Sequence, residues 1–188
     1  MLNILNDRTQ FGTRYIGPAS VKAKIKHRWR DVDVNVIKFE TNLGKELNCI
    51  EALKYLWSGK NLSASIAEEA RICGGASNVY AITSQERKLD KIEPSKILGV
   101  MTTGKIKKGE PTVEVYKIGV NPKYAYEQNK KSRELKHIAT ALIDAFAKKA
   151  RKSGVEPIVS FAEPGEEKFL SKVGLKPQCS EIVEIIGK

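Results

Sequence analysis

Hydrophobic and polar residues alternate along several stretches of the chain, which is the pattern of strands with one buried face. The alternation is clearest over residues 31–42, and shorter apolar runs bounded by turn-forming residues follow it. Together these patterns predict strands over residues 31–42, 78–84, 96–103, 111–120, 157–162 and 181–186.

Between these strands, apolar residues recur every three or four positions over 47–57, 62–73 and 133–152, which predicts helices. The clearest is 133–152, where Ser132 can cap the start and basic residues in the last turn complement the helix dipole. Pro164 opens a further short helix that ends at Gly174. The order β-α-α-β-β-β-α-β-α-β predicts an α/β fold with a sheet of mixed direction.

Composition narrows the class of protein. A chain of 188 residues with 41% hydrophobic and 29% charged residues is typical of one soluble globular domain. Its apolar runs are far shorter than the ~20 residues of a membrane helix, and its first residues lack the apolar stretch of a signal peptide. The three cysteines are widely spaced and form no Cys/His cluster, so we expect a cytoplasmic protein without a structural metal.

The formal net charge of +11 favours an anionic partner. Residues 1–30 carry seven Lys and Arg against one acid, so we predict a basic N-terminal extension, 1–30, before a domain spanning 31–188. A second basic cluster consists of Lys130, Lys131, Arg133 and Lys136. Either cluster can be a solvated face or can bind nucleic acid or an acidic protein surface.

Three segments follow one another along the chain. They are the strand over 112–122, the long helix that begins at a cluster of basic residues, and the pair of segments 158–161 and 169–177. This arrangement resembles the GNAT N-acetyltransferase superfamily. The resemblance covers residues 31–186 and is most specific over 112–177. It implies the GNAT acyl-CoA N-acyltransferase fold, a mixed and mostly antiparallel sheet flanked by helices, with acetyl-CoA as cofactor.

The resemblance also implies where the cofactor binds. The pantetheine arm would bond to the unpaired end of the 111–120 strand, and the CoA pyrophosphate would bind backbone N–H groups at the start of the long helix. The implied cofactor-binding residues are Ile118, Gly119, Val120, Lys130, Lys131, Arg133, Lys136, His137, Ile138, Ala139 and Thr140.

The phosphate-binding loop departs from the family's pattern, Arg/Gln-x-x-Gly-x-Gly/Ala, which falls on residues 134–139. Ala139 fits, but His137 replaces the first glycine and the leading basic residue is displaced to Arg133. A side chain at this position would crowd a phosphate where glycine allows close approach of the backbone. Either the neighbouring lysines and arginine bind the phosphates instead, or the loop does not bind CoA.

Acetyl transfer to an amine needs a base, because such an amine is mostly protonated at neutral pH. Glu114 lies six residues before Val120, where the resemblance implies the catalytic glutamate of the histone-acetylating branch. Tyr116 is the second catalytic candidate, since it faces the same side of a regular strand. For the general acid, several alternatives remain open: Tyr124, Tyr126, Ser171 and Cys179.

The predicted function is therefore direct acetyl transfer from acetyl-CoA to an amine, on a protein or another macromolecule. The positive charge favours an acidic macromolecule over a small cationic amine, which it would repel. The alternative is a catalytically inactive module of the same fold that binds nucleic acid or a protein partner through the basic clusters. Transfer of a longer acyl group is a third interpretation.

Overall fold

A computed structural model of the chain describes residues 13–40, 44–57, 77–86, 88–89, 91–125, 134–159, 170–171 and 175–177. The strands are β1 (Arg14–Ile25), β2 (Arg28–Phe39), β3 (Asn78–Thr83), β4 (Ile97–Thr103), β5 (Thr112–Val120), β6 (Leu135–Lys136), β7 (Glu156–Val159) and β8 (Lys176–Pro177). The α-helices are α1 (Gly44–Leu56) and α4 (Ile138–Lys152), and two short 3-10 helices are η1 (Pro94–Lys96) and η2 (Pro122–Tyr124).

The eight strands form one sheet in the order β6-β1-β2-β3-β4-β5-β7-β8. Neighbouring strands from β6 to β5 are antiparallel, whereas β7 is parallel to β5 and β8 is parallel to β7. Helix α4 connects β5 with β7, and such a crossover is what a parallel pair requires. These observations confirm the predicted α/β class with a mixed, mostly antiparallel sheet.

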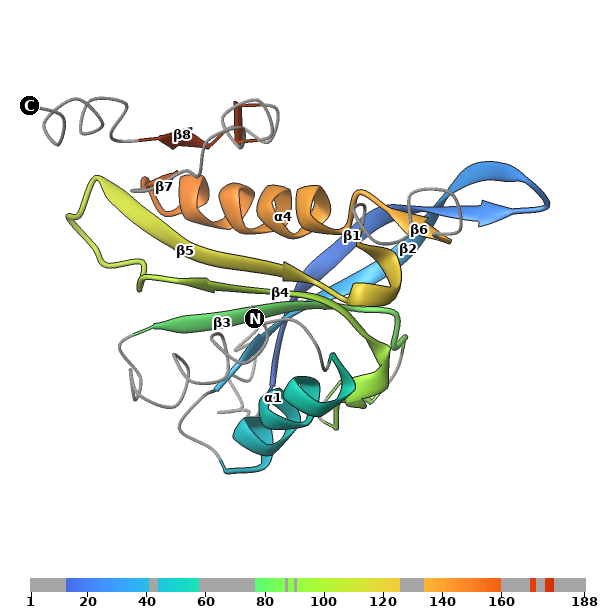
Figure 1. Cartoon of the computed structure of the whole chain (residues 1–188). Coiled ribbons are helices and arrows are strands. Elements are labelled where there is room, and N and C mark those ends of the chain that lie inside the picture. The colour runs from blue at the N-terminus through green and yellow to red at the C-terminus, as the bar shows by residue number, and fades with distance from the viewer. Residues whose placement is uncertain are drawn as a thin grey trace, which may run out of the picture.

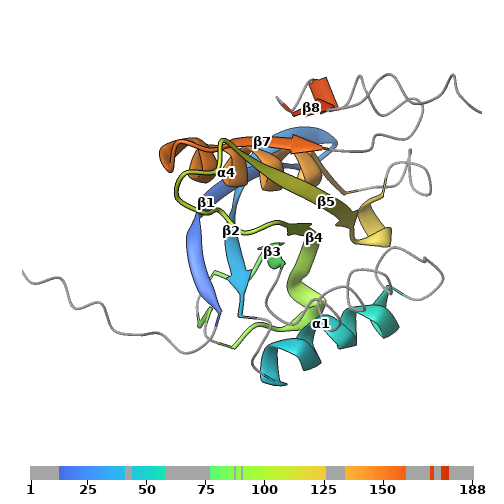
Figure 2. The same cartoon turned by 90° about the vertical axis from the view of Figure 1, so that its left-hand side faces the viewer.

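Helices cover both faces of the sheet, with α4 on one face and α1 on the other (Figures 1 and 2). The buried stripe of α4 includes Leu142 and Phe146, which are spaced one turn apart and face β3 and β5. The rings of Phe146 and Tyr80 lie 5.2 Å apart between centroids in a tilted arrangement. Full burial of each such side chain contributes about 1.5–3 kcal/mol, which fixes α4 against the sheet.

The opposite face of the sheet packs against α1. Ile50, Leu53 and Trp57 pack there against apolar side chains of β2, β3 and β4. A polar contact fixes the start of the same helix, because the Thr13 hydroxyl donates to the Glu46 carboxylate over 2.8 Å. The backbone N–H of Glu40 donates to the other carboxylate oxygen of Glu46, so this buried group links α1 to the end of β2.

Most predicted elements within the described residues are confirmed to within a few positions, namely β2, α1, β3, β4, β5, α4 and β7. The predicted helix over 62–73, the strand over 181–186 and most of the short helix before Gly174 lie outside the described residues. Within the part of the chain that is described, neither α-helix is long and apolar enough to span a membrane.

No strand or helix was named from the sequence before residue 31, and the structure shows that β1 begins at Arg14 and β2 at Arg28. The predicted boundary between residues 30 and 31 therefore lies inside β2. Lys26 and His27 join the two strands as a two-residue loop, and both have positive φ angles, 46° and 65°. The strand β1 is not evident from the sequence pattern, because Val21 is its only buried residue and Gly17 and Pro18 interrupt its alternation.

The start of the long helix was predicted too early. The helix α4 begins at Ile138 rather than at residue 133, and Leu135–Lys136 form strand β6. The backbone N–H of Lys24 donates to the Glu134 carbonyl over 2.8 Å, and β6 pairs with Lys22 and Ala23 of β1. These main-chain hydrogen bonds hold the segment extended, although its sequence has helical periodicity.

Gly99 of β4 allows α4 to approach the sheet closely. A Cβ atom at this position would lie 2.9 Å from Cγ2 of Ile138 and 3.1 Å from the backbone oxygen of Gly119. The absence of a side chain at residue 99 therefore sets how near the first turn of α4 comes to β4 and β5.

Gly99→Ala should lower the free energy of unfolding by about 1–3 kcal/mol, because overpacking at this contact forces α4 outward. Urea denaturation of the purified variant measures this change. A double-mutant cycle with Ile138→Ala should give a favourable coupling energy, since removing Cγ2 relieves part of the clash. Strict additivity of the two substitutions would contradict the contact.

Candidate functional site

Glu114 lies on β5, partly buried, on the face of the sheet that carries α1. Its neighbours in sequence, Val113 and Val115, are buried in the core beneath α4, so alternation along the strand turns Glu114 to the opposite face. Its backbone carbonyl accepts a hydrogen bond of 2.8 Å from the N–H of Gly104. On the other side Glu114 pairs with Ile158 of β7, so its backbone is held by a neighbour on each edge of β5.

Tyr116 does not follow the regular alternation on which its prediction relied. Thr103 pairs with Val115 and Thr102 pairs with Lys117, so β5 carries one extra residue, Tyr116, at a β-bulge. The side chain of Tyr116 is 44% exposed, and its hydroxyl oxygen lies 3.2 Å from where a Cβ of Gly104 would be. The bulge changes which residues of β5 face the core beneath α4. Before the bulge these are the odd-numbered Val113 and Val115, and after it they are the even-numbered Ile118 and Val120.

The last residues of β5 have a strand partner on one edge within the described part of the chain. Ile118, Gly119 and Val120 pair with β4. On the other edge, the parallel pairing with β7 covers Thr112, Val113 and Glu114 and goes no further among the described residues. Six further residues of β5 have no partner in β7 among the described residues, which reach Val159 there.

The first turn of α4 lies beside this end of β5, since Ile138 packs over Gly99, which pairs with Val120. The N–H of Ala141 makes the first helical bond, to the carbonyl of His137 over 2.9 Å. The N–H groups of Ile138, Ala139 and Thr140 precede that bond, and such groups at a helix start have no partner within the helix. The predicted donors therefore begin at Ile138, because residues 135 and 136 belong to β6.

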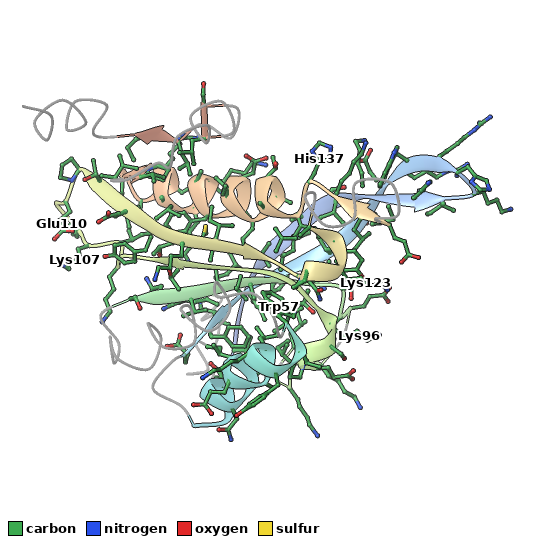
Figure 3. All side chains as sticks on the ribbon, viewed as in Figure 1. Trp57, Lys96, Lys107, Glu110, Lys123 and His137 are labelled. Atoms are coloured by element: carbon green, nitrogen blue, oxygen red, sulfur yellow. The ribbon has the colours of Figure 1, made fainter. Side chains whose placement is uncertain are left out.

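His137 occupies the residue before α4 and has a left-handed backbone conformation, with φ 67° and ψ 20°. Its side chain is exposed and does not cap the helix. Figure 3 shows it at the N-terminal end of α4, whereas Lys107 and Glu110 lie at the far left of the view, toward the other end of the helix. The backbone here adopts a conformation that favours glycine, the residue that His137 replaces in the loop pattern.

Of the four cations predicted to bind phosphate, one lies within the described residues. Lys130, Lys131 and Arg133 lie outside the described residues. The ammonium of Lys136 lies 4.1 Å from the ring centroid of Trp29, a cation–π contact with the β1–β2 hairpin. This contact directs Lys136 toward the hairpin.

A cavity of about 410 Å³ lies elsewhere, between the first residues of β1 and the C-terminal half of α4. Its cationic lining consists of Arg14, Lys148, Lys149 and Lys152, and no carboxylate of the described residues lines it. Burial, followed by repulsion from Arg14 and Lys38, lowers the pKa of Lys149 below its ordinary value. The sequence pattern assigned these lysines to the helix dipole and so missed that Arg14 faces them.

Compared with known proteins, the chain matches no family model and no curated protein. In the described part of the chain, no three or more His, Cys, Asp or Glu side chains are grouped so that they could hold a metal ion. The described residues bring together the end of β5 and the first turn of α4, whereas Glu114 lies on the other face of the sheet, six residues before Val120. In this arrangement, backbone N–H groups can donate hydrogen bonds to an extended, anionic ligand, and the Glu114 carboxylate can accept a proton.

His137→Gly should raise the free energy of unfolding by about 0.5–1 kcal/mol, because a left-handed residue with a Cβ costs about 1–2 kcal/mol and the greater flexibility of unfolded glycine offsets part of this gain. His137→Ala is the matched control, since it removes the imidazole and keeps the Cβ. Urea denaturation compares the two variants. Equal stability of both would show that backbone conformation at residue 137 is not what matters.

Proposed function

We propose that the protein is an acetyl-CoA-dependent N-acetyltransferase that transfers acetyl to an amine on a protein or another macromolecule, within a GNAT-type fold. The observation that carries this proposal is that the end of β5 lies beside the first turn of α4. Among the described residues, pairing with β7 covers Thr112 to Glu114, whereas β5 continues to Val120, whose partner Gly99 lies against Ile138. The resemblance read from the sequence assigns cofactor binding to these same two segments.

The residues present are chemically suited to CoA. The backbone groups of Ile118, Gly119 and Val120 can bond to the amides of a pantetheine arm as an added strand would. The N–H groups of Ile138, Ala139 and Thr140, with the positive end of the helix dipole, suit a pyrophosphate. The left-handed backbone at His137 matches the glycine of the loop pattern, and its side chain is exposed.

Acetyl-CoA, when bound, supplies the activated acetyl group, and the chain supplies the base. In this proposal the Glu114 carboxylate accepts the proton from the acceptor nitrogen, directly or through a water, so that the nitrogen can react. Glu114 faces the α1 side of the sheet, so the acceptor would approach from that side. A net charge of +11 favours an acceptor that carries negative charge around its amine.

Titration calorimetry with acetyl-CoA and, separately, with CoA tests the cofactor site. Micromolar affinity is expected for both, because most of the assigned contacts involve the pantetheine arm and the pyrophosphate. No detectable heat at millimolar ligand would contradict the proposal and favour the alternative, a module of this fold without catalysis.

Glu114→Gln tests the base. We expect turnover to fall by about 10²–10⁴-fold, since that is what a general base contributes, while CoA affinity stays within about twofold. Release of free thiol is measured with an acidic peptide that contains one lysine. Glu93→Gln is the charge-matched control on an exposed residue, and turnover of the two variants at the same rate would remove Glu114 from the mechanism.

A further inference from the structure

The hairpin of β1 and β2 extends beyond the rest of the sheet as a two-stranded ribbon. Among the described residues, β3 pairs with β2 only over residues 35–39 on one side, and β6 pairs only with Lys22 and Ala23 on the other. The end of the hairpin projects as an arm, which is visible in blue at the right of Figure 1. We call residues 20–33 the arm. Its base, with the buried Val21 and the paired Lys22 and Ala23, belongs to the sheet, and residues 24–30 extend beyond it by about 10 Å at about 3.3 Å per residue.

The outer part of the arm is strongly cationic. Its seven residues from Lys24 to Arg30 include four cations and no carboxylate. The two acids of the arm, Asp31 and Asp33, lie nearer its base, where Asp31 forms an ion pair of 3.0 Å with Lys22. The outer cations are exposed and form no ion pair with any described residue: Lys24, Lys26, Arg28 and Arg30.

The cations occupy both faces of the ribbon and its tip. The register pairs Ala23 with Arg30 and Ile25 with Arg28, which places both arginines on one face. Lys24 pairs with Trp29 on the other face, and Lys26 lies in the loop at the tip. A ribbon that binds a flat acidic surface needs cations on one face only, whereas a ribbon inside a groove meets phosphates on both walls.

We propose that the arm binds double-stranded DNA by entering the major groove, with its four outer cations contacting phosphates on both sides. The major groove of B-DNA, about 12 Å wide, admits a two-stranded ribbon, and the corresponding groove of A-form RNA is too narrow. Single strands bind to exposed aromatic platforms. Of the two rings in the arm, the indole of Trp29 is partly buried and lies against the Lys136 ammonium, and only the small imidazole of His27 is exposed.

This DNA-binding surface is independent of the acetyltransferase proposal and is tested without any CoA present. The measurement is fluorescence anisotropy of a labelled 20-base-pair DNA duplex of arbitrary sequence, at several NaCl concentrations from 50 to 200 mM. The arm variant replaces Lys24, Lys26, Arg28 and Arg30 with Gln. The control variant makes the same change in charge at exposed lysines elsewhere: Lys91, Lys96, Lys105 and Lys108.

The wild-type protein should bind the duplex with a linear fall of log K against log salt. The arm variant should bind more weakly, with a salt slope shallower by up to about four, roughly one for each cation lost. The control variant should keep most of the wild-type slope and affinity. Should the arm variant melt below the wild-type temperature, the pair Lys26→Gln and Arg28→Gln replaces it and should lose about half as much slope.

Several results would overturn the proposal. They are absence of duplex binding by the wild-type protein, equal losses in the arm and control variants, and tighter binding of single-stranded DNA or of an RNA duplex of the same sequence. Equal competition by polyglutamate would instead identify the arm as a general polyanion surface. None of these results bears on the calorimetry with CoA, so failure of one proposal is distinguishable from failure of the other.

Discussion

The position of α4 against the sheet is the constraint on which the candidate site depends. Its buried stripe, including Leu142 and Phe146, fixes the helix axis across β3 and β5, and Gly99 lets Ile138 approach β4 without a clash. Together these contacts hold the first turn of α4 beside the end of β5. Neither segment alone would make a binding site, because an extended ligand needs donors from both at a fixed separation.

The sequence was sufficient to predict those elements in which the spacing of the apolar residues by itself indicates which residues are buried. The α4 helix and strands β3, β4 and β5 belong to this group, since α4 buries one stripe, the first part of β5 buries alternate residues, and every residue of β3 and β4 is buried. The helix start at Ile138 was not predictable in this way. Leu135 continues the helical spacing, but hydrogen bonds from a strand more than a hundred residues earlier hold it extended. Such a long-range pairing leaves no local signal.

For the candidate site, the sequence identified the segments but not all of their geometry. The segments at Ile118–Val120 and Ile138–Thr140 were identified from a resemblance in element order, and the structure brings them together. The relation of Tyr116 to Glu114 was predicted from strict alternation, which fails at the bulge. The cations of the arm were recognised as a cluster, but their placement on both faces of a ribbon depends on the register of β1 with β2. Charge is visible in a sequence, whereas its arrangement in space requires strand pairing.

The loop at the end of the β1–β2 hairpin has a backbone conformation that its two residue types disfavour. Two-residue hairpin loops with positive φ at both positions favour Asn-Gly or similar pairs, because residues with a larger side chain resist this conformation. Here Lys26 and His27 occupy both positions, with φ angles of 46° and 65°. The strand pairing on either side offsets the conformational cost of these two residues. The end of the hairpin thus exposes an ammonium and an imidazole at positions where the turn geometry favours smaller residues.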